Sequence, residues 1–242
     1  MIAISDHDGV RSITLERAER GNALSGELVE VLITAVQQTS ADASLHTMVL
    51  CANGKNFCTG FDLSDLETSS DGDLLLRFVR VEQLLAAIWQ APMRTVAIAQ
   101  GRAWGAGADL FACCDERVVL KDASFRFPGA GFGLVLGTRR LAERVGVDRA
   151  RAWIIEGRQV SAEQALESGM ATDLATDAAS ARGRLVQIPA VSPATARQIR
   201  SASRADLSDT DLAALIRSAS LPGLKQRILT YRDALRRTSG KD

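Results

Sequence analysis

The chain contains few of the residues that build metal sites, disulfide scaffolds or nucleic-acid-binding surfaces. Its 242 residues include two histidines, four cysteines and five prolines, and 5% of them are aromatic. Positive and negative side chains number 29 each, so the formal net charge is zero, which argues against a nucleic-acid groove or an acidic tail. No apolar run is long enough to span a bilayer, and the stretch from Met1 to Asp6 lacks the pattern of a signal peptide.

The cysteines also lack the spacing of metal ligands. Cys51, Cys58, Cys113 and Cys114 form no paired motif, and we expect buried free thiols in a reducing cytosol, which indicates a cytoplasmic protein. No Walker loop, dinucleotide fingerprint or Ser/His/Asp set is apparent. The sequence therefore predicts no metal and no separate cofactor.

Apolar periodicity predicts strands and helices that alternate through the first half of the chain. The predicted strands cover residues 10–15, 48–51, 95–99 and 117–120. The predicted helices cover residues 28–36 after a Ser25 N-cap, 74–88 before Ala91-Pro92, and 105–113. This alternation is typical of a parallel sheet with crossover helices, in an α/β fold.

From Gly137 onward the pattern is helical, with a break between Ile188-Pro189 and Ser192-Pro193. The predicted helical segments are residues 141–145, 149–155, 162–167, 207–218 and 224–236. We find no internal repeat and no low-complexity linker.

Two glycine-centred segments are the most informative motifs. Residues 56–63 contain Gly60, residues 100–109 contain Gly105 and Gly107, and each segment lies between a strand-like run and a helix. Glycine lets the backbone approach a ligand closely, and the N-terminus of a following helix favours negative charge. Two backbone N–H groups held in this way can stabilise a carbonyl oxygen that becomes negative during a reaction. Together the segments predict an oxyanion hole.

Further motifs follow in a fixed order at residues 16–24, 114–118, 127–128 and 137–141. With the two glycine segments they make roughly residues 1 to 170 resemble the enoyl-CoA hydratase/isomerase (crotonase) superfamily. The resemblance implies a crotonase-like spiral of ββα units over residues 1–190 and a C-terminal helical region over 191–242. It also implies an enzyme of acyl-CoA thioesters, of the kind found in fatty acid metabolism, that assembles as a homotrimer or a dimer of trimers.

The resemblance assigns catalytic roles by matching position. The oxyanion donors would be the N–H groups of Phe61 and Ala106, and Asp109 matches one of the two acidic residues with which hydratases hold a water molecule. Asp109 is one helical turn beyond Ala106 and so faces the same pocket, although aspartate is a methylene shorter than the usual glutamate. The second acidic position is Gly129, and no Asp or Glu lies between Ala123 and Ala142.

The resemblance also implies where the coenzyme A part of the substrate binds. The adenine would lie along the Asn-Ala-Leu turn at residues 22–24 and after the first glycine segment, with basic residues near the phosphates. The candidates are Arg17, Arg20, Ala23, Lys55, Asp62 and Leu63. Lys225 on a late helix is a weaker candidate.

The sequence is compatible with three functions. The leading one is an acyl-CoA enzyme with a single acid, Asp109, which isomerises, hydrolyses or decarboxylates its substrate; hydration is in doubt because of Gly129. The second is a non-catalytic acyl-CoA-binding protein on the same fold. The third is an unrelated α/β scaffold.

Overall fold

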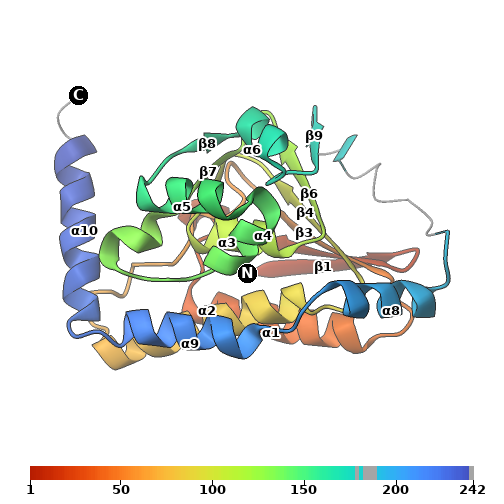
Figure 1. The fold of residues 1–242 in the computed structure, drawn as a ribbon, viewed down its shortest axis with the longest axis horizontal. Coiled ribbons are helices and arrows are strands. Elements are labelled where there is room, and N and C mark those ends of the chain that lie inside the picture. The colour runs from red at the N-terminus through yellow and green to blue at the C-terminus, as the bar shows by residue number, and fades with distance from the viewer. Residues whose placement is uncertain (178–179, 182–189, 240–242) are drawn as a thin grey trace.

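The computed structural model describes residues 1–177, 180–181 and 190–239 (Figure 1). The strands are β1 (Ile2–His7), β2 (Val10–Leu15), β3 (Thr47–Ala52), β4 (Arg94–Ala99), β5 (Arg102–Trp104), β6 (Glu116–Leu120), β7 (Ser124–Arg126), β8 (Val160–Ser161) and β9 (Asp173–Ala175). The α-helices are α1 (Gly26–Ala41), α2 (Asp71–Trp89), α3 (Ala106–Cys113), α4 (Thr138–Val145), α5 (Val147–Ile155), α6 (Ala162–Ser168), α8 (Pro193–Ser203), α9 (Ser208–Ala219) and α10 (Leu224–Ser239). Two 3₁₀ turns are η1 (Ala18–Arg20) and η2 (Pro128–Phe132).

The main sheet has six strands in the order β1-β2-β3-β4-β6-β9. The β1–β2 pair is antiparallel and every other neighbouring pair is parallel. Ile13, Leu50 and Ala97 stand side by side in register and belong to the large core beneath α1, α2 and α3. Val49 and Val96, one residue away, belong to a separate apolar cluster. Successive side chains therefore alternate between two buried faces, which explains the continuous apolar runs of the central strands.

A second layer makes the fold a spiral. After β3, β4 and β6 the chain forms a short extended segment in this layer and then a helix. The segments are the bridge residue Cys58 after β3, strand β5 after β4, and strand β7 after β6. Cys58 pairs in parallel with Ala103 of β5, and β5 pairs in parallel with β7. This is the α/β spiral of ββα units that the resemblance implied.

Several predicted elements agree closely with the structure. The Ser25 side chain caps α1 by accepting the Leu28 N–H, and a Ser70–Asp73 capping box starts α2. Strands β3, β4 and β6 and helices α9 and α10 contain or nearly match the predicted ranges. The break at Ile188-Pro189 and the end of the predicted region 1–190 lie largely outside the described residues.

Other elements were not predicted, for identifiable reasons. Strand β1 lies at the sheet edge and exposes five of its six side chains, so it carries no apolar alternation. Strands β5, β7, β8 and β9 have three residues or fewer, too few for a period to appear. Helix α8 buries none of its residues. Hydrophobic periodicity cannot identify an element that buries little or is this short.

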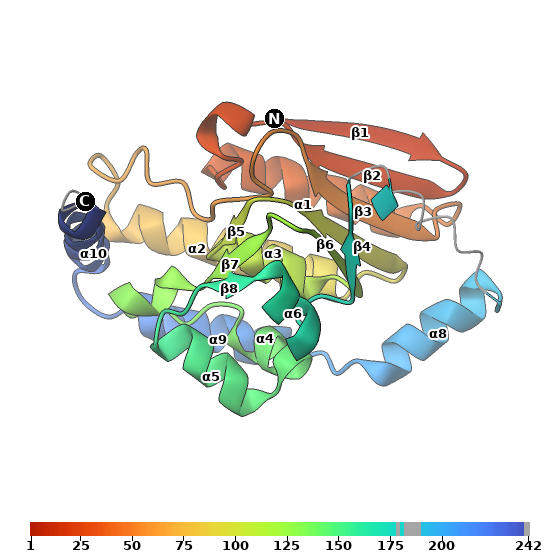
Figure 2. The ribbon, with the colours of Figure 1, turned by 90° about the horizontal axis from the view of Figure 1, so that it is seen from above.

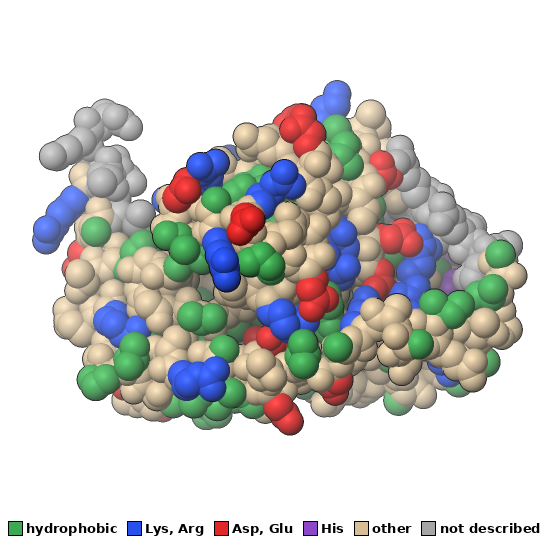
Figure 3. Space-filling model, in the orientation of Figure 1, with side chains coloured by type: hydrophobic (Ala, Val, Ile, Leu, Met, Phe, Trp, Pro, Cys, Tyr) green, Lys and Arg blue, Asp and Glu red, His purple; other side chains and the backbone are tan. Residues whose placement is uncertain are grey.

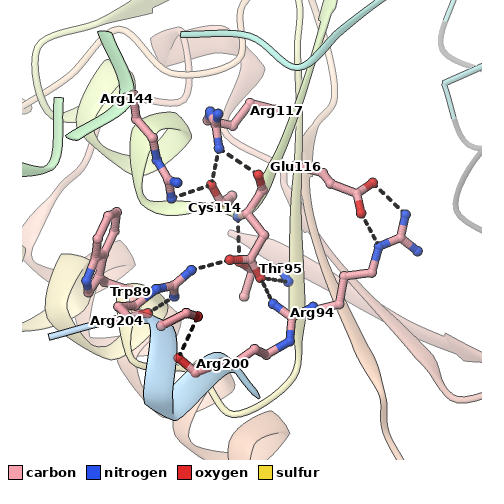
Figure 4. Close-up of polar contacts among 11 residues, drawn as sticks. Trp89, Arg94, Thr95, Cys114, Glu116, Arg117, Arg144, Arg200 and Arg204 are labelled. Atoms are coloured by element: carbon pink, nitrogen blue, oxygen red, sulfur yellow. Dashed lines mark hydrogen bonds and ion pairs between the residues drawn. The ribbon is translucent and has the colours of Figure 1, made fainter. Parts of the chain in front are cut away.

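The C-terminal helices cover different parts of the spiral, with α8 and α10 at opposite ends of the molecule (Figures 1 and 2). Helix α9 packs along α2, and α10 packs against η2 and the start of α2. Helix α8 is held by Arg200 and Arg204, whose guanidinium groups both pair with Asp115. Arg204 also donates to the Trp89 carbonyl oxygen, as Figure 4 shows.

Two more arginines stabilise the end of α3 near this contact. Arg117 and Arg144 both donate to the carbonyl oxygen of Cys114, at 2.8 and 3.0 Å (Figure 4). Cations at a helix C-terminus interact favourably with the exposed carbonyl groups. Burial nevertheless lowers the pKa of Arg117 to about 10, so this site carries a desolvation cost.

The surface agrees with the balanced composition. On the face drawn in Figure 3, basic and acidic side chains are interspersed. None of the helices in the described part of the chain is both long and apolar enough to cross a membrane. Within the same part, His, Cys, Asp and Glu side chains form no cluster of three or more that could hold a metal ion.

Candidate active site

The first glycine segment directs one main-chain N–H away from the body of the fold. Leu24 pairs in parallel with Phe61, so the Leu24 N–H donates to the Gly60 carbonyl oxygen at 2.8 Å and the Asp62 N–H donates to the Leu24 carbonyl oxygen at 3.1 Å. In a trans peptide the C=O and N–H groups point in opposite directions. Because the Gly60 carbonyl points at Leu24, the Phe61 N–H points the other way, and it donates to no acceptor in the described residues.

The second segment orients another N–H by the same principle. The Gly105 carbonyl oxygen accepts the N–H groups of Ala108 and Asp109, at 2.8 and 3.1 Å. The N–H of Ala106 lies in the same peptide unit and therefore points outward from the N-terminus of α3. First-turn N–H groups have no partner within a helix, and among the described residues the Ala106 N–H has none outside it.

The register of the second layer brings together the two segments that carry these N–H groups. Cys58 pairs in parallel with Ala103, and Phe61 and Ala106 each lie three residues further along their segments. The glycines allow close contact: a Cβ atom on Gly60 would lie 3.6 Å from the Ala106 nitrogen and only 2.7 Å from the Trp104 carbonyl oxygen. Gly60 has a φ of +97°, a backbone conformation that side chains disfavour. The predicted donors therefore lie on adjacent segments.

Asp109 is buried in α3, one turn beyond Ala106. It is 5% exposed, and its Oδ1 atom has no hydrogen-bond partner among the described residues. The carboxyl group packs against the backbone at the start of α4, where a Cβ atom on Gly137 would lie 2.0 Å from Oδ1. Burial raises the pKa of Asp109 well above its ordinary value; the negative charge of Glu82 raises it further, and Arg140 opposes the shift.

The raised pKa of Asp109 predicts a pH-dependent penalty to stability. The folded protein holds this proton more tightly than the unfolded chain, so stability falls as pH rises from the ordinary value of 3.8 toward the raised pKa. Asp109→Asn cannot ionise and should therefore be more stable than wild type at about pH 7, with the difference shrinking toward about pH 4. Denaturant unfolding across this range measures the effect. The exposed substitution Asp122→Asn is the control, and a pH-independent difference for Asp109→Asn would contradict the prediction.

A buried ion pair near Asp109 was not predicted. Glu82 of α2 and Arg140 of α4 are each 1% exposed and form a hydrogen-bonded pair at 2.6 Å. Asp211 of α9 lies 3.0 Å from the same guanidinium group. The sequence held one signal for this pair, because Glu82 lies four residues after Phe78 in the apolar stripe of α2. A charged residue at a core position of a helix usually has a buried partner.

The position of the absent second carboxylate is next to the second segment. Pro128 of η2 is in contact range of Gly105, since a Cβ atom on Gly105 would lie 3.5 Å from Pro128 Cγ. Gly129 follows, and the nearest atoms to a Cβ atom placed there would be those of Leu134 at 3.8 Å. The backbone would accept a side chain at residue 129, so the missing carboxylate reflects the sequence and not a lack of space.

The structure joins three of the predicted coenzyme A residues in one structural contact. Arg17 donates to the Ala23 carbonyl oxygen at 2.6 Å and pairs with Asp62 at 3.0 Å. The other Asp62 oxygen accepts the Ser64 N–H at 2.9 Å. The Arg17 guanidinium group therefore fixes the Asn-Ala-Leu turn to the first segment, a role that the sequence did not predict.

The remaining candidates are placed differently. Arg20 and Lys55 are both exposed. The segments that carry them lie close together, since a Cβ atom on Gly54, next to Lys55, would lie 2.5 Å from Ala18 Cβ of η1. Leu63 is half-buried at the edge of an apolar cluster. Lys225 donates to the Glu67 carbonyl oxygen at 2.6 Å and so belongs to the contact that holds α10.

Comparison with known proteins gives a consistent result. The sequence model of the enoyl-CoA hydratase/isomerase family matches residues 5–221. The chain is 40% identical over 179 residues to "Probable enoyl-CoA hydratase echA6" of Mycobacterium tuberculosis, covering 73% of this chain and 71% of that protein. It is 31% identical over 218 residues to "Probable enoyl-CoA hydratase EchA14" of the same species, covering 87% and 81%.

A solved structure supports the same assignment. The crystal structure of a "putative enoyl-CoA hydratase/isomerase" from Bordetella parapertussis superposes with a TM-score of 0.88 at 43% sequence identity, covering 95% of this chain and 97% of that one. The likeness of fold thus extends through the C-terminal helices, beyond the motifs found in the sequence. The chain belongs to the enoyl-CoA hydratase/isomerase (crotonase) family.

Proposed function

We propose that the chain is an enzyme of acyl-CoA thioesters in which the N–H groups of Phe61 and Ala106 bind the thioester oxygen and Asp109 handles a proton or a water molecule. The observation that supports this proposal is the pairing of Cys58 with Ala103, three residues before Phe61 and Ala106, whose N–H groups have no partner among the described residues. An oxyanion forms at the thioester oxygen when the substrate becomes an enolate or a tetrahedral intermediate. Fixed N–H donors stabilise that charge, and removing one typically costs about 3–4 kcal/mol.

A single carboxyl group limits the reactions that this site supports. Gly129 occupies the position of the second acid, and η2 carries no carboxylate. Glu82 is a second carboxylate whose charge acts on Asp109, but Arg140 already binds it. Two-carboxylate hydration is therefore less well supported than double-bond migration, hydrolysis or decarboxylation, each of which needs one proton-transferring group.

The raised pKa of Asp109 favours a proton donor at the start of the reaction. A buried carboxyl group of this kind retains its proton at a higher pH than an exposed aspartate does. It can then protonate the α-carbon of the enolate that loss of CO₂ from an acyl-CoA leaves at the Phe61 and Ala106 N–H groups, whereas double-bond migration would need Asp109 to start ionised and act first as the base. General acid catalysis by a positioned side chain contributes about 10²–10⁴-fold in rate.

The surroundings support further parts of the proposal. We propose that Arg20 and Lys55, which are exposed near one another, bind the phosphates of coenzyme A. The coenzyme A moiety belongs to the substrate, and we propose no separate cofactor. Four buried cysteines without disulfides suit a reducing compartment such as the cytoplasm. We also propose a homotrimer or a dimer of trimers, as the family resemblance implies.

The proposal is tested with Asp109→Ala. A panel of unsaturated, branched and hydroxy acyl-CoAs, followed by mass spectrometry, identifies the substrate that wild type converts. Asp109→Ala should then lower turnover of that substrate at least about tenfold, with little change in ligand affinity. The exposed substitution Asp122→Asn is the control. Equal turnover by Asp109→Ala and wild type would remove Asp109 from the mechanism.

Gly129 favours one alternative, a non-catalytic acyl-CoA-binding protein on the same fold. Binding needs the donor N–H groups and the coenzyme A contacts but no second acid. Tight binding of acyl-CoAs without product across the whole panel would support this alternative. Any turnover that depends on Asp109 would exclude it.

A further inference from the structure

Arg77 of α2 lies against the first glycine segment, which it contacts in two ways, and against Asp65 just after that segment. Its Nη2 atom donates to the Asp62 carbonyl oxygen at 2.8 Å, and Nη1 pairs with Asp65 at 2.6 Å. Its guanidinium carbon lies 4.1 Å from the centre of the Phe61 ring. The Arg77 side chain is 14% exposed, so these contacts are largely shielded from water.

The next residue of α2 contacts the other part of the same segment. The Phe78 ring stacks on the Phe61 ring, with centroids 4.2 Å apart and planes at 20°. Phe78 is buried in the cluster that joins α2, α9 and α10. The Phe61 ring therefore makes a cation–π contact with Arg77 and stacks on Phe78, and these two residues are consecutive on α2.

These contacts act on the residue whose N–H is the proposed donor. The Leu24 N–H fixes the Gly60–Phe61 peptide plane from one side through the Gly60 carbonyl. Arg77 fixes the chain after Phe61 through the Asp62 carbonyl and fixes the Phe61 side chain through its ring. Two hydrogen bonds and one cation–π contact thus restrict rotation of the donor peptide.

Arg80, one turn later on α2, shows what an ordinary surface arginine of this helix does. It pairs with Glu30 of α1 and Gln83 of α2, and it is more exposed than Arg77. Arg77 instead donates to a main-chain carbonyl of a loop. The two residues share a helix and a charge but differ in this contact.

We propose that Arg77 is a positioning residue that keeps the Phe61 N–H directed at the thioester oxygen. The inference rests on the proposed function, since it assigns a role within that oxyanion hole. Donor geometry matters strongly, because a misplacement of about 1 Å can cost about 10²-fold in rate. In this role Arg77 acts through the first glycine segment, by way of the Asp62 carbonyl and the Phe61 ring.

The test uses Arg77→Met, which keeps the aliphatic stem but removes the hydrogen bonds and the charge. Isotope-edited infrared spectroscopy of butyryl-CoA labelled with ¹³C at the thioester carbonyl reports how strongly the N–H groups polarise that bond. Bound to wild type, the carbonyl stretch should move to lower frequency. Arg77→Met should lose at least about half of this displacement. With the acyl-CoA substrate that the panel identifies, it should lower kcat at least about tenfold and change KM less than about threefold. Arg77→Lys should restore part of kcat.

Two further variants keep the test decisive. Arg80→Met is the matched control and should retain the wild-type displacement. Asp65→Asn removes the charge that pairs with Arg77, at a side chain that is 53% exposed. It should reduce the displacement of the carbonyl stretch as Arg77→Met does, but by less. This result can be measured even if Arg77→Met fails to fold. The inference would be overturned if Asp65→Asn kept the wild-type displacement of the carbonyl stretch and Arg77→Met either kept it too or failed to fold. No displacement in wild type would instead contradict the oxyanion hole itself.

Discussion

Replacing Arg140 with methionine should lower the free energy of unfolding by about 3–5 kcal/mol, because it leaves a buried carboxylate without its partner. Glu82 and Arg140 are each 1% exposed, and Asp211 contacts the same guanidinium group. Without Arg140, Glu82 must either keep a buried charge or take up a proton. Urea unfolding of Arg140→Met and wild type at the same pH measures the loss.

A double substitution separates this cause from simple loss of packing. In Glu82→Leu/Arg140→Met both charges are gone, and Asp211 still pairs with Arg139 at 2.7 Å. Replacing a buried ion pair by apolar side chains is often neutral or stabilising, so the double variant should recover most of the lost stability. Arg151→Met, at an exposed position of α5, is the matched control. A double variant as unstable as Arg140→Met would contradict the electrostatic explanation.

Replacing Gly107 with alanine should lower turnover by about 10²-fold or more, because it separates the two donor segments. A Cβ atom at Gly107 would lie 2.2 Å from the Cys58 carbonyl oxygen, well inside contact distance. Cys58 pairs with Ala103, so the added methyl group forces apart the segments that carry Phe61 and Ala106. Overpacking of this kind should also cost about 1–3 kcal/mol of stability. Steady-state kinetics and denaturant unfolding measure the two effects.

Gly72→Ala is the matched control for this substitution. Gly72 lies in the first turn of α2, where the nearest atom to an added Cβ would be Ser70 Oγ at 3.7 Å. Alanine is favoured over glycine in a helix, so this variant should be slightly more stable than wild type with unchanged turnover. Wild-type turnover in Gly107→Ala would show that the close contact of the two segments does not matter for activity.

The sequence predicts best those features that depend on neighbouring residues. Ser25 predicts the start of α1 because capping is a local interaction, and the apolar run from Met48 to Cys51 predicts β3 because both faces of that strand are buried. The motif order placed Phe61, Ala106 and Asp109 on two segments, and the structure brings those segments together. Their catalytic roles remain predictions.

The features that the sequence does not predict depend on distant partners. In the sequence Arg17 looks like a basic loop residue that could bind phosphate. Its partner in the structure is Asp62, which lies 45 residues away, so the sequence does not predict that contact. Arg77 and Arg80 are indistinguishable in the sequence of α2, and only the folded chain shows that one of them reaches the Asp62 carbonyl. Helix α8 buries no residue, so its docking through Arg200 and Arg204 leaves no apolar pattern to detect.

A crystal structure of the protein with a bound acyl-CoA tests the central claim most directly. Both main-chain nitrogens, of Phe61 and of Ala106, should lie about 2.7–3.1 Å from the thioester oxygen, with Asp109 facing the α-carbon. A thioester bound elsewhere, or nitrogens that point away from its oxygen, would contradict the account.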